Sequence, residues 1–307
     1  MHKSIVVIGS SNTDMIVKAS RIPHPGETVL GGKFTVAAGG KGANQAVAAA
    51  RAGGKVTFIA RVGDDMFGER SIIEFARDGI DIEHIIRDPE APSGVALITV
   101  DEKGENSITV APGCNARLSP RDIEKAEKVI SSARILLVQL EIPFETVEKA
   151  VEIAFAHNVD VLLNPAPAQP MDDAFLKKVS LITPNKNEAE LLTGIRVDDE
   201  LSAAKAAGIL RNRGIKSVFI TLGAQGVYTS SPEFRGIIPA FPVKAEDTTA
   251  AGDVFNGVLA VSLSKGECLL DAVRFASAAA AISVTRMGAQ TSAPYRAEIE
   301  EFLKMQG

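Results

Sequence analysis

An aspartate that follows a turn of small residues is the strongest chemical feature of this sequence. The segment runs Asp247-Thr-Thr-Ala-Ala-Gly-Asp253 and opens a helical pattern. The first N–H groups of a helix lack internal partners and the helix dipole favours an anion, so Ala250, Ala251 and Gly252 could hold a phosphate. Asp253 could accept the proton of a substrate hydroxyl. An ordinary acidic residue at a helix N-terminus gives the same pattern, and the residues alone favour neither interpretation.

A glycine-rich segment, AGGKGANQ at residues 38–45, could contact a second ligand. Its glycines permit a tight turn and a close approach to a ligand, and Lys41 and Asn44 could bind sugar hydroxyls. Neither the GxGxxG spacing nor the P-loop pattern GxxxxGK[ST] is present. Taken alone, an ordinary strand-to-helix turn explains the segment better. Asn12 and Asp14, two residues apart after the first expected strand, lie on one side of an extended chain.

Two polar segments follow later strands. Asn185 and Glu188 are three residues apart and share one face of a helix. They could hold the waters of a hydrated Mg²⁺, although a helix capping box is the better explanation for the pair alone. The segment 221–226, TLGAQG, could cradle a nucleotide, but a turn between two strands has the same appearance.

Composition argues against several other classes of protein. The 307 residues are 46% hydrophobic and 23% charged, as in a soluble globular protein, and the formal net charge is −5. This charge disfavours nucleic-acid binding, and no apolar run approaches the roughly 18 residues that span a bilayer. The four histidines lack metal-site spacing, and the two distant cysteines suggest a reducing compartment. We therefore expect a cytoplasmic protein with neither a nucleic-acid partner nor a membrane attachment.

The elements that must position these residues follow two patterns. After Leu118, buried strands alternate with helices, which predicts a mostly parallel sheet covered on both faces. Earlier strands, near residues 11–17, 28–36 and 94–111, cannot all join that sheet. We therefore expect residues 1–307 to form one α/β domain with a central sheet flanked by helices and a second, small β-sheet.

Ligands of open α/β sheets bind at the carboxyl ends of the strands. The candidate residues follow expected strands and should therefore meet at one edge of the sheet: Asn12, Asp14, residues 39–44, Glu141, Asn185, Glu188, residues 221–226 and residues 247–253.

In this order and at these spacings, the segments resemble the ribokinase-like (PfkB) carbohydrate kinase family from about residue 4 to residue 305. The resemblance is carried by GSSNTD at 9–14, PGET at 25–28, GGKGANQAVAA at 39–49, GDD at 63–65, NPAPA at 164–168, TPN at 183–185, DTTAAGD at 247–253 and VTRMGAQ at 284–290. The Asp247 motif marks the whole family. The complete 39–45 segment and the final TRMGAQ are similar to its ribokinase branch in particular.

The resemblance implies an α/β sandwich whose small β-sheet is a lid, and a homodimer in which the lids of two subunits clasp. It implies ATP-dependent phosphorylation of D-ribose at the 5-hydroxyl, giving ribose 5-phosphate and ADP. Asp253 would be the base, and Ala250, Ala251 and Gly252 would form the anion hole. Mg²⁺ and an activating K⁺ are the implied cofactors.

Site residues carry over position by position. The sugar-binding residues would be Asn12, Asp14, Gly40, Lys41, Gly42, Ala43, Asn44, Glu141 and Asp253. Those at ATP would be Asn185, Thr221, Gly223, Ala224, Gln225, Gly226, Gly252, Asp253 and Ser277. K⁺ would be held, mostly by backbone carbonyls, at Asp247, Thr249, Ser283, Arg286, Gly288 and Ser292. Mg²⁺ would be held through water at Asn185 and Glu188. Ser277 departs from the larger side chain expected there, which leaves the nucleotide affinity open.

Other functions remain open on the sequence. A kinase of the same fold could act on deoxyribose, a nucleoside or a hexose, although the first hundred residues contain no Trp or Tyr to stack on a base. A sugar-binding regulator without catalysis is the alternative from another class. The intact Ala-Ala-Gly-Asp253 segment, together with Asn185 and Glu188, favours the enzyme.

Overall fold

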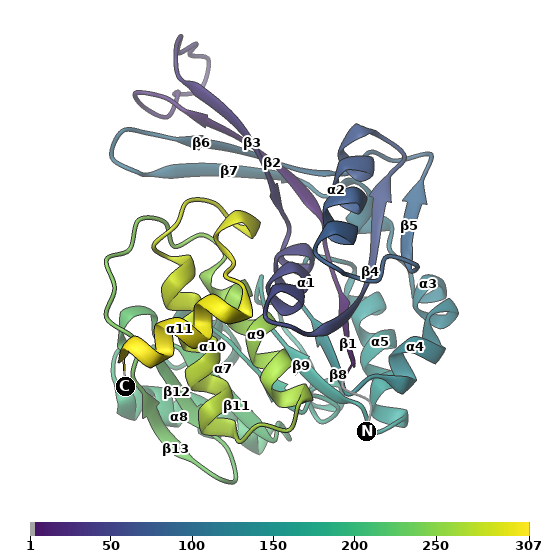
Figure 1. Cartoon of the computed structure of the whole chain (residues 1–307), viewed down its shortest axis with the longest axis vertical. Coiled ribbons are helices and arrows are strands. Elements are labelled where there is room, and N and C mark those ends of the chain that lie inside the picture. Colours follow the sequence, from purple (N-terminus) through teal and green to yellow (C-terminus); the bar gives the residue numbers. More distant parts are fainter. Residues whose placement is uncertain (1–3, 307) are drawn as a thin grey trace.

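A nine-stranded sheet forms the centre of the computed structural model, which describes residues 4–306 (Figure 1). The strands from β5 to β11 run parallel, and β12 and β13 are added antiparallel at one edge. In sheet order the strands are β13 (Arg235–Ile238), β12 (Val227–Ser230), β11 (Ser217–Thr221), β10 (Leu181–Ile182), β9 (Asp160–Leu163), β8 (Ile135–Val138), β1 (Ser4–Ile8), β4 (Lys55–Gly63) and β5 (Ile85–Asp88).

Helices cover both faces of this sheet because its central strands are apolar on both sides. β1 and β8 are continuous aliphatic runs, and their side chains are divided between two hydrophobic clusters. One cluster includes residues of α3 (Pro120–Lys125), α4 (Glu127–Ser132), α5 (Phe144–Ala156), α6 (Asp173–Leu176), α7 (Lys186–Thr193) and α8 (Glu200–Asn212). The other includes residues of α1 (Lys41–Arg51), α2 (Met66–Arg77), α9 (Ala251–Ser264), α10 (Leu269–Ser283) and α11 (Arg296–Gln306).

Close packing of α1 against α9 brings together the two segments that sequence analysis singled out. A Cβ added at Gly257 in α9 would lie 2.5 Å from the carbonyl oxygen of Gln45 in α1. A Cβ at Gly42 would lie 2.7 Å from the Cα of Gly9, at the end of β1. Glycine is therefore required at both positions, and the N-termini of the two helices meet at the carboxyl edge of the sheet.

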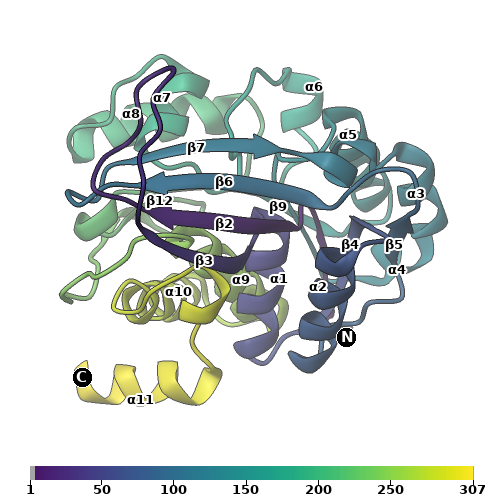
Figure 2. The ribbon, with the colours of Figure 1, turned by 90° about the horizontal axis from the view of Figure 1, so that it is seen from above.

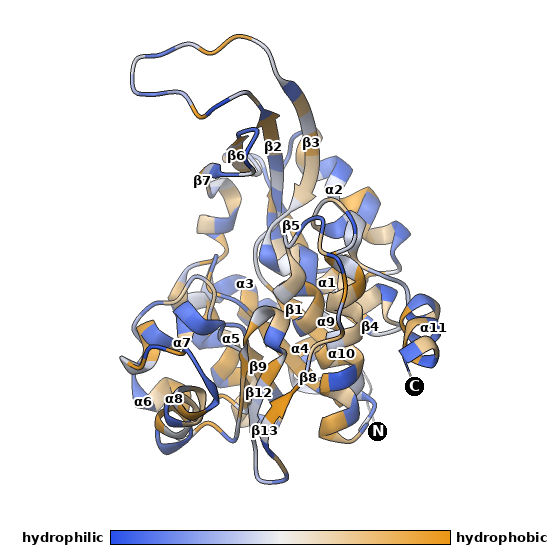
Figure 3. Ribbon diagram, turned by 90° about the vertical axis from the view of Figure 1, so that its left-hand side faces the viewer, coloured by the Kyte–Doolittle hydropathy of each residue, from blue (hydrophilic) through white to orange (hydrophobic). Residues whose placement is uncertain are grey.

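A separate four-stranded sheet projects from the body of the molecule (Figures 1 and 3). Seen from above, it lies across the helices and strands of the main body (Figure 2). We call it the lid sheet, and its order is β3 (Lys33–Gly39), β2 (Asn12–Lys18), β6 (Gly94–Val100) and β7 (Asn106–Ala111). The expected fold, a mostly parallel sheet flanked by helices with a small second sheet, is confirmed.

Some boundaries differ from the expectation. The third early strand begins at Lys33 and not at residue 28, because Gly31 and Gly32 have φ values of +97° and +117°, which are incompatible with a strand. β5, β12, β13, α3 and α4 were not expected. Segment 221–226 proves to be a turn between antiparallel strands, containing the 3₁₀ turn η2 (Gly223–Gln225). Among residues 4–306, no helix is long and apolar enough to cross a membrane.

Candidate active site

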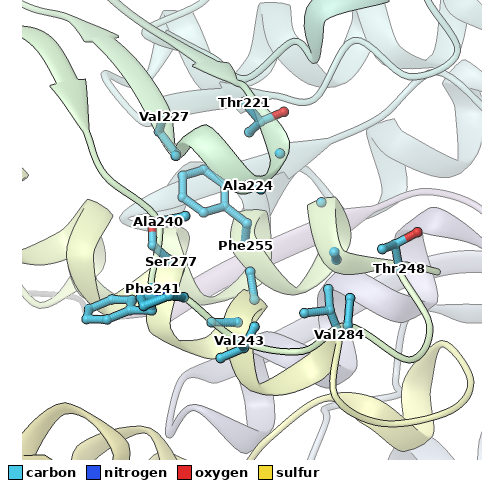
Figure 4. Close-up of a pocket in the computed structure, with 18 residues that line it drawn as sticks. Thr221, Ala224, Val227, Ala240, Phe241, Val243, Thr248, Phe255, Ser277 and Val284 are labelled. Carbon is cyan, nitrogen blue, oxygen red and sulfur yellow. The ribbon is translucent and has the colours of Figure 1, made fainter. Parts of the chain in front are cut away.

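A cavity of about 560 Å³ opens at the carboxyl end of β11, beside the N-terminus of α9 (Figure 4). Its size and its mainly apolar walls suit a nucleobase and ribose. The structure places six of the nine expected ATP-site residues on its wall: Thr221, Gly223, Ala224, Gly226, Gly252 and Ser277. Asn185, Gln225 and Asp253 are absent from the wall. The Gln225 Oε1 accepts a hydrogen bond of 3.0 Å from Lys186 Nζ.

Sequence reasoning missed most of the apolar wall. These residues come from the segment after β13 and from inward faces of α9 and α10: Ala240, Phe241, Pro242, Val243, Phe255, Ala280, Ala281 and Val284. The only sequence signal was an apolar stretch just before the Asp247 motif. Ser277 also lies here, and its buried Oγ has no hydrogen-bond partner among the described residues.

The N-terminus of α9 presents backbone to this cavity. Ala250 adopts a left-handed conformation (φ +58°, ψ +12°), which turns the chain sharply into the helix. A Cβ added at Gly252 would meet no atom within 4 Å, so the backbone there is open to a ligand. The Ala251 N–H already donates to Thr248 O at 3.3 Å, which leaves the N–H groups of Gly252 and Asp253 as the better anion donors.

Asp253 is buried in the first turn of α9 and is held by two amides from α1. Asn44 Nδ2 donates to its Oδ2 at 2.9 Å, and Gln45 Nε2 donates to its Oδ1 at 2.8 Å. Burial raises the pKa of Asp253, while Lys41 and the two amides act in the opposite direction. The result is a fixed carboxylate with the basicity that a proton acceptor needs.

A chain of buried amides fixes the orientation of Gln45. Gln139 Nε2 donates to Gln45 Oε1 at 2.6 Å, so the Nε2 of Gln45 must face Asp253. The same Nε2 also donates to Asn164 Oδ1 at 3.0 Å. Gln45 and Asn164 belong to the family motifs but had no expected role, because Gln45 contacts Gln139, Asn164 and Asp253 at separations of 94 to 208 positions along the chain.

A second polar region lies beneath the lid sheet, next to Asp253. Glu141 Oε2 accepts hydrogen bonds from Ser10 Oγ at 2.5 Å and from the Lys41 N–H at 3.0 Å. Asp14 lies against Gly39, where a Cβ would come within 2.3 Å of its carboxylate. Gly40 (φ +88°) has no room for a side chain, because a Cβ would lie 2.7 Å from the Asn12 backbone nitrogen.

Charges in this polar region perturb one another. Burial raises the pKa of Asp14 to about 6, and nearby Glu141 adds to the shift. Burial alone would lower the pKa of Lys41, but the carboxylates of Asp253, Glu141 and Glu188 outweigh it and raise the pKa. Lys41 is thus an ammonium between the polar region and the helix N-terminus.

This region also contains a free acceptor. Asn44 Oδ1 is buried without a hydrogen-bond partner among the described residues. A buried acceptor of this kind costs free energy unless a ligand satisfies it, so it points to a bound hydroxyl or amine. Gly42 and Ala43, the other expected sugar contacts, lie in the first turn of α1.

Asn185 and Glu188 form the capping box that was the better explanation for the pair alone. Asn185 Oδ1 accepts from the Glu188 N–H, and Glu188 Oε2 accepts from the Asn185 N–H, both at 2.8 Å. Burial raises the pKa of Glu188, which lies within electrostatic range of Lys41 and Asp253. Only one carboxylate oxygen of this pair remains free, which suits contact through a metal-bound water.

The expected cation loop is held together by a carboxylate. Asp247 accepts from the N–H groups of Thr249 at 2.9 Å and Gly288 at 2.8 Å, and so joins segments 247–249 and 283–292. The Arg286 guanidinium instead contacts Glu298 at 2.5 Å. Ser283 and Ser292 are buried in the second segment. Their hydroxyls donate to the carbonyls of Ala280 and Ala289, both at 2.8 Å. The expected contribution of backbone carbonyls to a cation site is compatible with this arrangement.

A parallel α/β sheet, a cavity for a nucleotide and a buried carboxylate at a helix N-terminus are the parts of a small-molecule kinase. The chain belongs to the pfkB family of carbohydrate kinases, because the sequence model of that family matches residues 2–296. It is 47% identical over 304 residues to the ribokinase of Haemophilus influenzae, covering 99% of each chain.

Solved structures agree with this assignment. The ribokinase of Thermotoga maritima is 41% identical, with a TM-score of 0.90 over 98% of this chain and 99% of that one. The ribokinase of Arabidopsis thaliana, complexed with ribose and ATP, is 29% identical, with a TM-score of 0.91 over 99% of each chain. The family resemblance read from the motifs is therefore confirmed.

Proposed function

We propose that this protein phosphorylates D-ribose at the 5-hydroxyl with ATP, giving ribose 5-phosphate and ADP. The observation that carries the proposal is the position of Asp253, at the N-terminus of α9 between the cavity and the polar region beneath the lid sheet. The activity named for the similar proteins of Haemophilus influenzae and Arabidopsis thaliana supports the same reaction.

In this mechanism the sugar lies in the polar region and ATP in the cavity. Asp253 takes the proton of the sugar hydroxyl as that oxygen attacks the γ-phosphorus in line. The N–H groups of Gly252 and Asp253 stabilise the negative charge that develops on the phosphoryl oxygens. The carboxylates of Asp14 and Glu141 and the Asn44 amide orient the sugar, and the lid sheet excludes water.

Two cations belong to the proposal. Mg²⁺ would lie near Glu188 and Asn185, bound through water, and would supply charge neutralisation for the phosphates. K⁺ would be held by carbonyls of segments 247–249 and 283–292. In the protein itself, Asp247 keeps these two segments together beside the α9 N-terminus.

The lid sheet is the proposed dimer surface of this cytoplasmic enzyme. Residues that pair directly across strands share one face of a sheet, so Asp14, Ala96 and Val110 lie on one face. Farther from the body, the same face carries Ile16, Ile98 and Ile108. We call this surface the inner lid face. An apolar surface of this kind on a projecting sheet suits contact with the lid sheet of a second copy.

ATP consumption by the purified protein tests the activity. D-ribose, 2-deoxyribose, fructose and adenosine would be compared in the presence of Mg²⁺, with and without K⁺. We expect turnover that is selective for ribose and stimulated by K⁺. Selective turnover of another sugar would replace the substrate and keep Asp253. Binding of ribose without any turnover would favour the sugar-binding regulator.

A further inference from the structure

Asn115 joins the lid sheet to the segment that carries Asn12. It lies in the 3₁₀ turn η1 (Gly113–Arg117), directly after lid strand β7, and its side chain is only 2% exposed. Its Oδ1 accepts from the Ser11 N–H at 2.9 Å, and its Nδ2 donates to the Ser11 carbonyl at 3.1 Å. The second Nδ2 hydrogen goes to Asn12 Oδ1, at 2.7 Å.

These contacts determine which atom of Asn12 is free. The Ser11 N–H can only donate and the Ser11 carbonyl can only accept, so the backbone fixes the two ends of the Asn115 amide. Because Asn115 presents an N–H to Asn12, the atom of Asn12 at that contact must be its oxygen. The side-chain hydrogen bond of Asn12 to the rest of residues 4–306 uses its Oδ1, and none is donated by its Nδ2. Asn12 therefore offers a donor to a ligand.

The backbone around this amide pair leaves it little freedom. Gly94 pairs with Asn12 across strands β6 and β2. A Cβ at Gly94 would lie 2.3 Å from both Asn115 Nδ2 and Asn12 Oδ1. Glycine at this position is thus needed for the hydrogen bond between the two amides.

We propose that Asn115 is a positioning residue that holds Asn12 as a hydrogen-bond donor to the sugar. The inference rests on the proposed function. Asn12 and Asp14 share the inner lid face, so the pair offers a donor and a carboxylate acceptor side by side. Such a pair matches a sugar hydroxyl or vicinal diol, and an analogue that lacks one hydroxyl leaves a buried polar group unsatisfied.

The test is Asn115→Asp. The carboxylate still accepts from the Ser11 N–H, but it has no hydrogen to give to Asn12, which must then turn its oxygen towards the sugar. We expect the KM for ribose and its calorimetric Kd to rise roughly 10- to 100-fold, as for a lost buried hydrogen bond. We expect kcat to stay within about threefold and the preference for ribose over 2-deoxyribose to shrink.

Two further variants distinguish a misplaced Asn12 side chain from a general loss of folding. Gly94→Ala pushes the two amides apart from the other side and should raise KM in the same way. Ser93→Ala is the matched control, because the Ser93 hydroxyl bonds Asp65 and the Gly63 N–H at the same base of the lid but does not touch Asn12. It should lower the melting temperature with little change in KM.

The outcomes separate this inference from the proposed function. If the wild type phosphorylates ribose and Asn115→Asp changes only the melting temperature, or lowers kcat without raising KM, the inference is wrong. If the wild type phosphorylates a different sugar, the proposed substrate fails, and the KM for that sugar decides the role of Asn115. If no sugar binds to the wild type, both are wrong.

Discussion

At the scale of single residues, Asp253 makes the most direct prediction. Asp253→Asn keeps the shape of the side chain but removes the proton acceptor, so we expect kcat to fall roughly 10²- to 10⁴-fold. Ribose affinity, measured by calorimetry, should change only a few-fold. Asp172→Asn is the control for loss of a carboxylate near a helix N-terminus, because Asp172 is the N-cap of α6 and lies outside the site. Unchanged turnover in Asp253→Asn would disprove its role as base.

Asp14 predicts a pH dependence of stability. Its folded-state pKa of about 6 lies above the ordinary value of 3.8, so the folded protein binds this proton more tightly than the unfolded chain. The ionised carboxylate therefore costs stability above about pH 6, and the cost disappears below about pH 4. We expect Asp14→Asn to stabilise the protein at pH 8 by on the order of 1–3 kcal/mol.

Denaturant titrations of both proteins between pH 4 and pH 8 would measure this difference. A gain in stability that is independent of pH would show that the charge of Asp14 is not its cause. Protonation of Asp14 should also affect sugar binding, because a neutral carboxyl group is a weaker acceptor of a sugar hydroxyl than a carboxylate, and one of its oxygens carries a hydrogen. The ribose KM of the wild type should accordingly rise as the pH falls below about 6.

At the scale of elements, the turn before α9 places an alanine in a left-handed conformation that favours glycine. Ala250 has φ +58°, which an alanine adopts at a cost of about 1 kcal/mol. Ala250→Gly should relieve that cost and raise the melting temperature slightly. Ala251→Gly, one residue later at the first helical position, is the control and should lower it. A lower melting temperature in both variants would contradict the strain argument.

Helices and central strands could be predicted from the sequence because their patterns are local. The alanine-rich α1 and the apolar β1 show their character within ten residues. β12 and β13 were missed because short antiparallel strands at a sheet edge carry no comparable pattern. The start of β3 was misplaced because the positive φ values of Gly31 and Gly32 cannot be read from a β-rich composition.

The candidate site could be predicted from the sequence only in part. Asp253 and the glycine segment stand in motifs whose spacing is visible in the sequence. The amides that orient Gln45 and Asn12 were not predictable, since Gln139 and Asn115 reach them only through tertiary folding. The apolar wall around Phe241 was also missed, because apolar residues are equally suited to a core.

At the scale of the whole molecule, the site belongs to two parts of the fold. Asp253 and the cavity lie in the main body, whereas Asn12 and Asp14 lie on the lid strand β2. Sugar affinity should therefore depend on how the lid sheet is held over the body. A partner subunit that supports the lid would influence sugar binding without touching the nucleotide cavity.

Single charges on the two faces of the lid sheet test this coupling. Ile108 on the inner lid face and Leu97 on the opposite face are both 54% exposed, so the two sites are matched in exposure and differ in the side of the sheet on which they lie. In the proposed dimer, Ile108→Glu introduces like charges into an apolar interface and should yield a monomer in analytical ultracentrifugation. Leu97→Glu should stay dimeric.

The monomeric variant should also bind ribose more weakly, while its KM for ATP changes little. If Leu97→Glu breaks the dimer and Ile108→Glu does not, the interface lies on the other face, and if the wild type is a monomer, the lid sheet is supported by its own subunit alone.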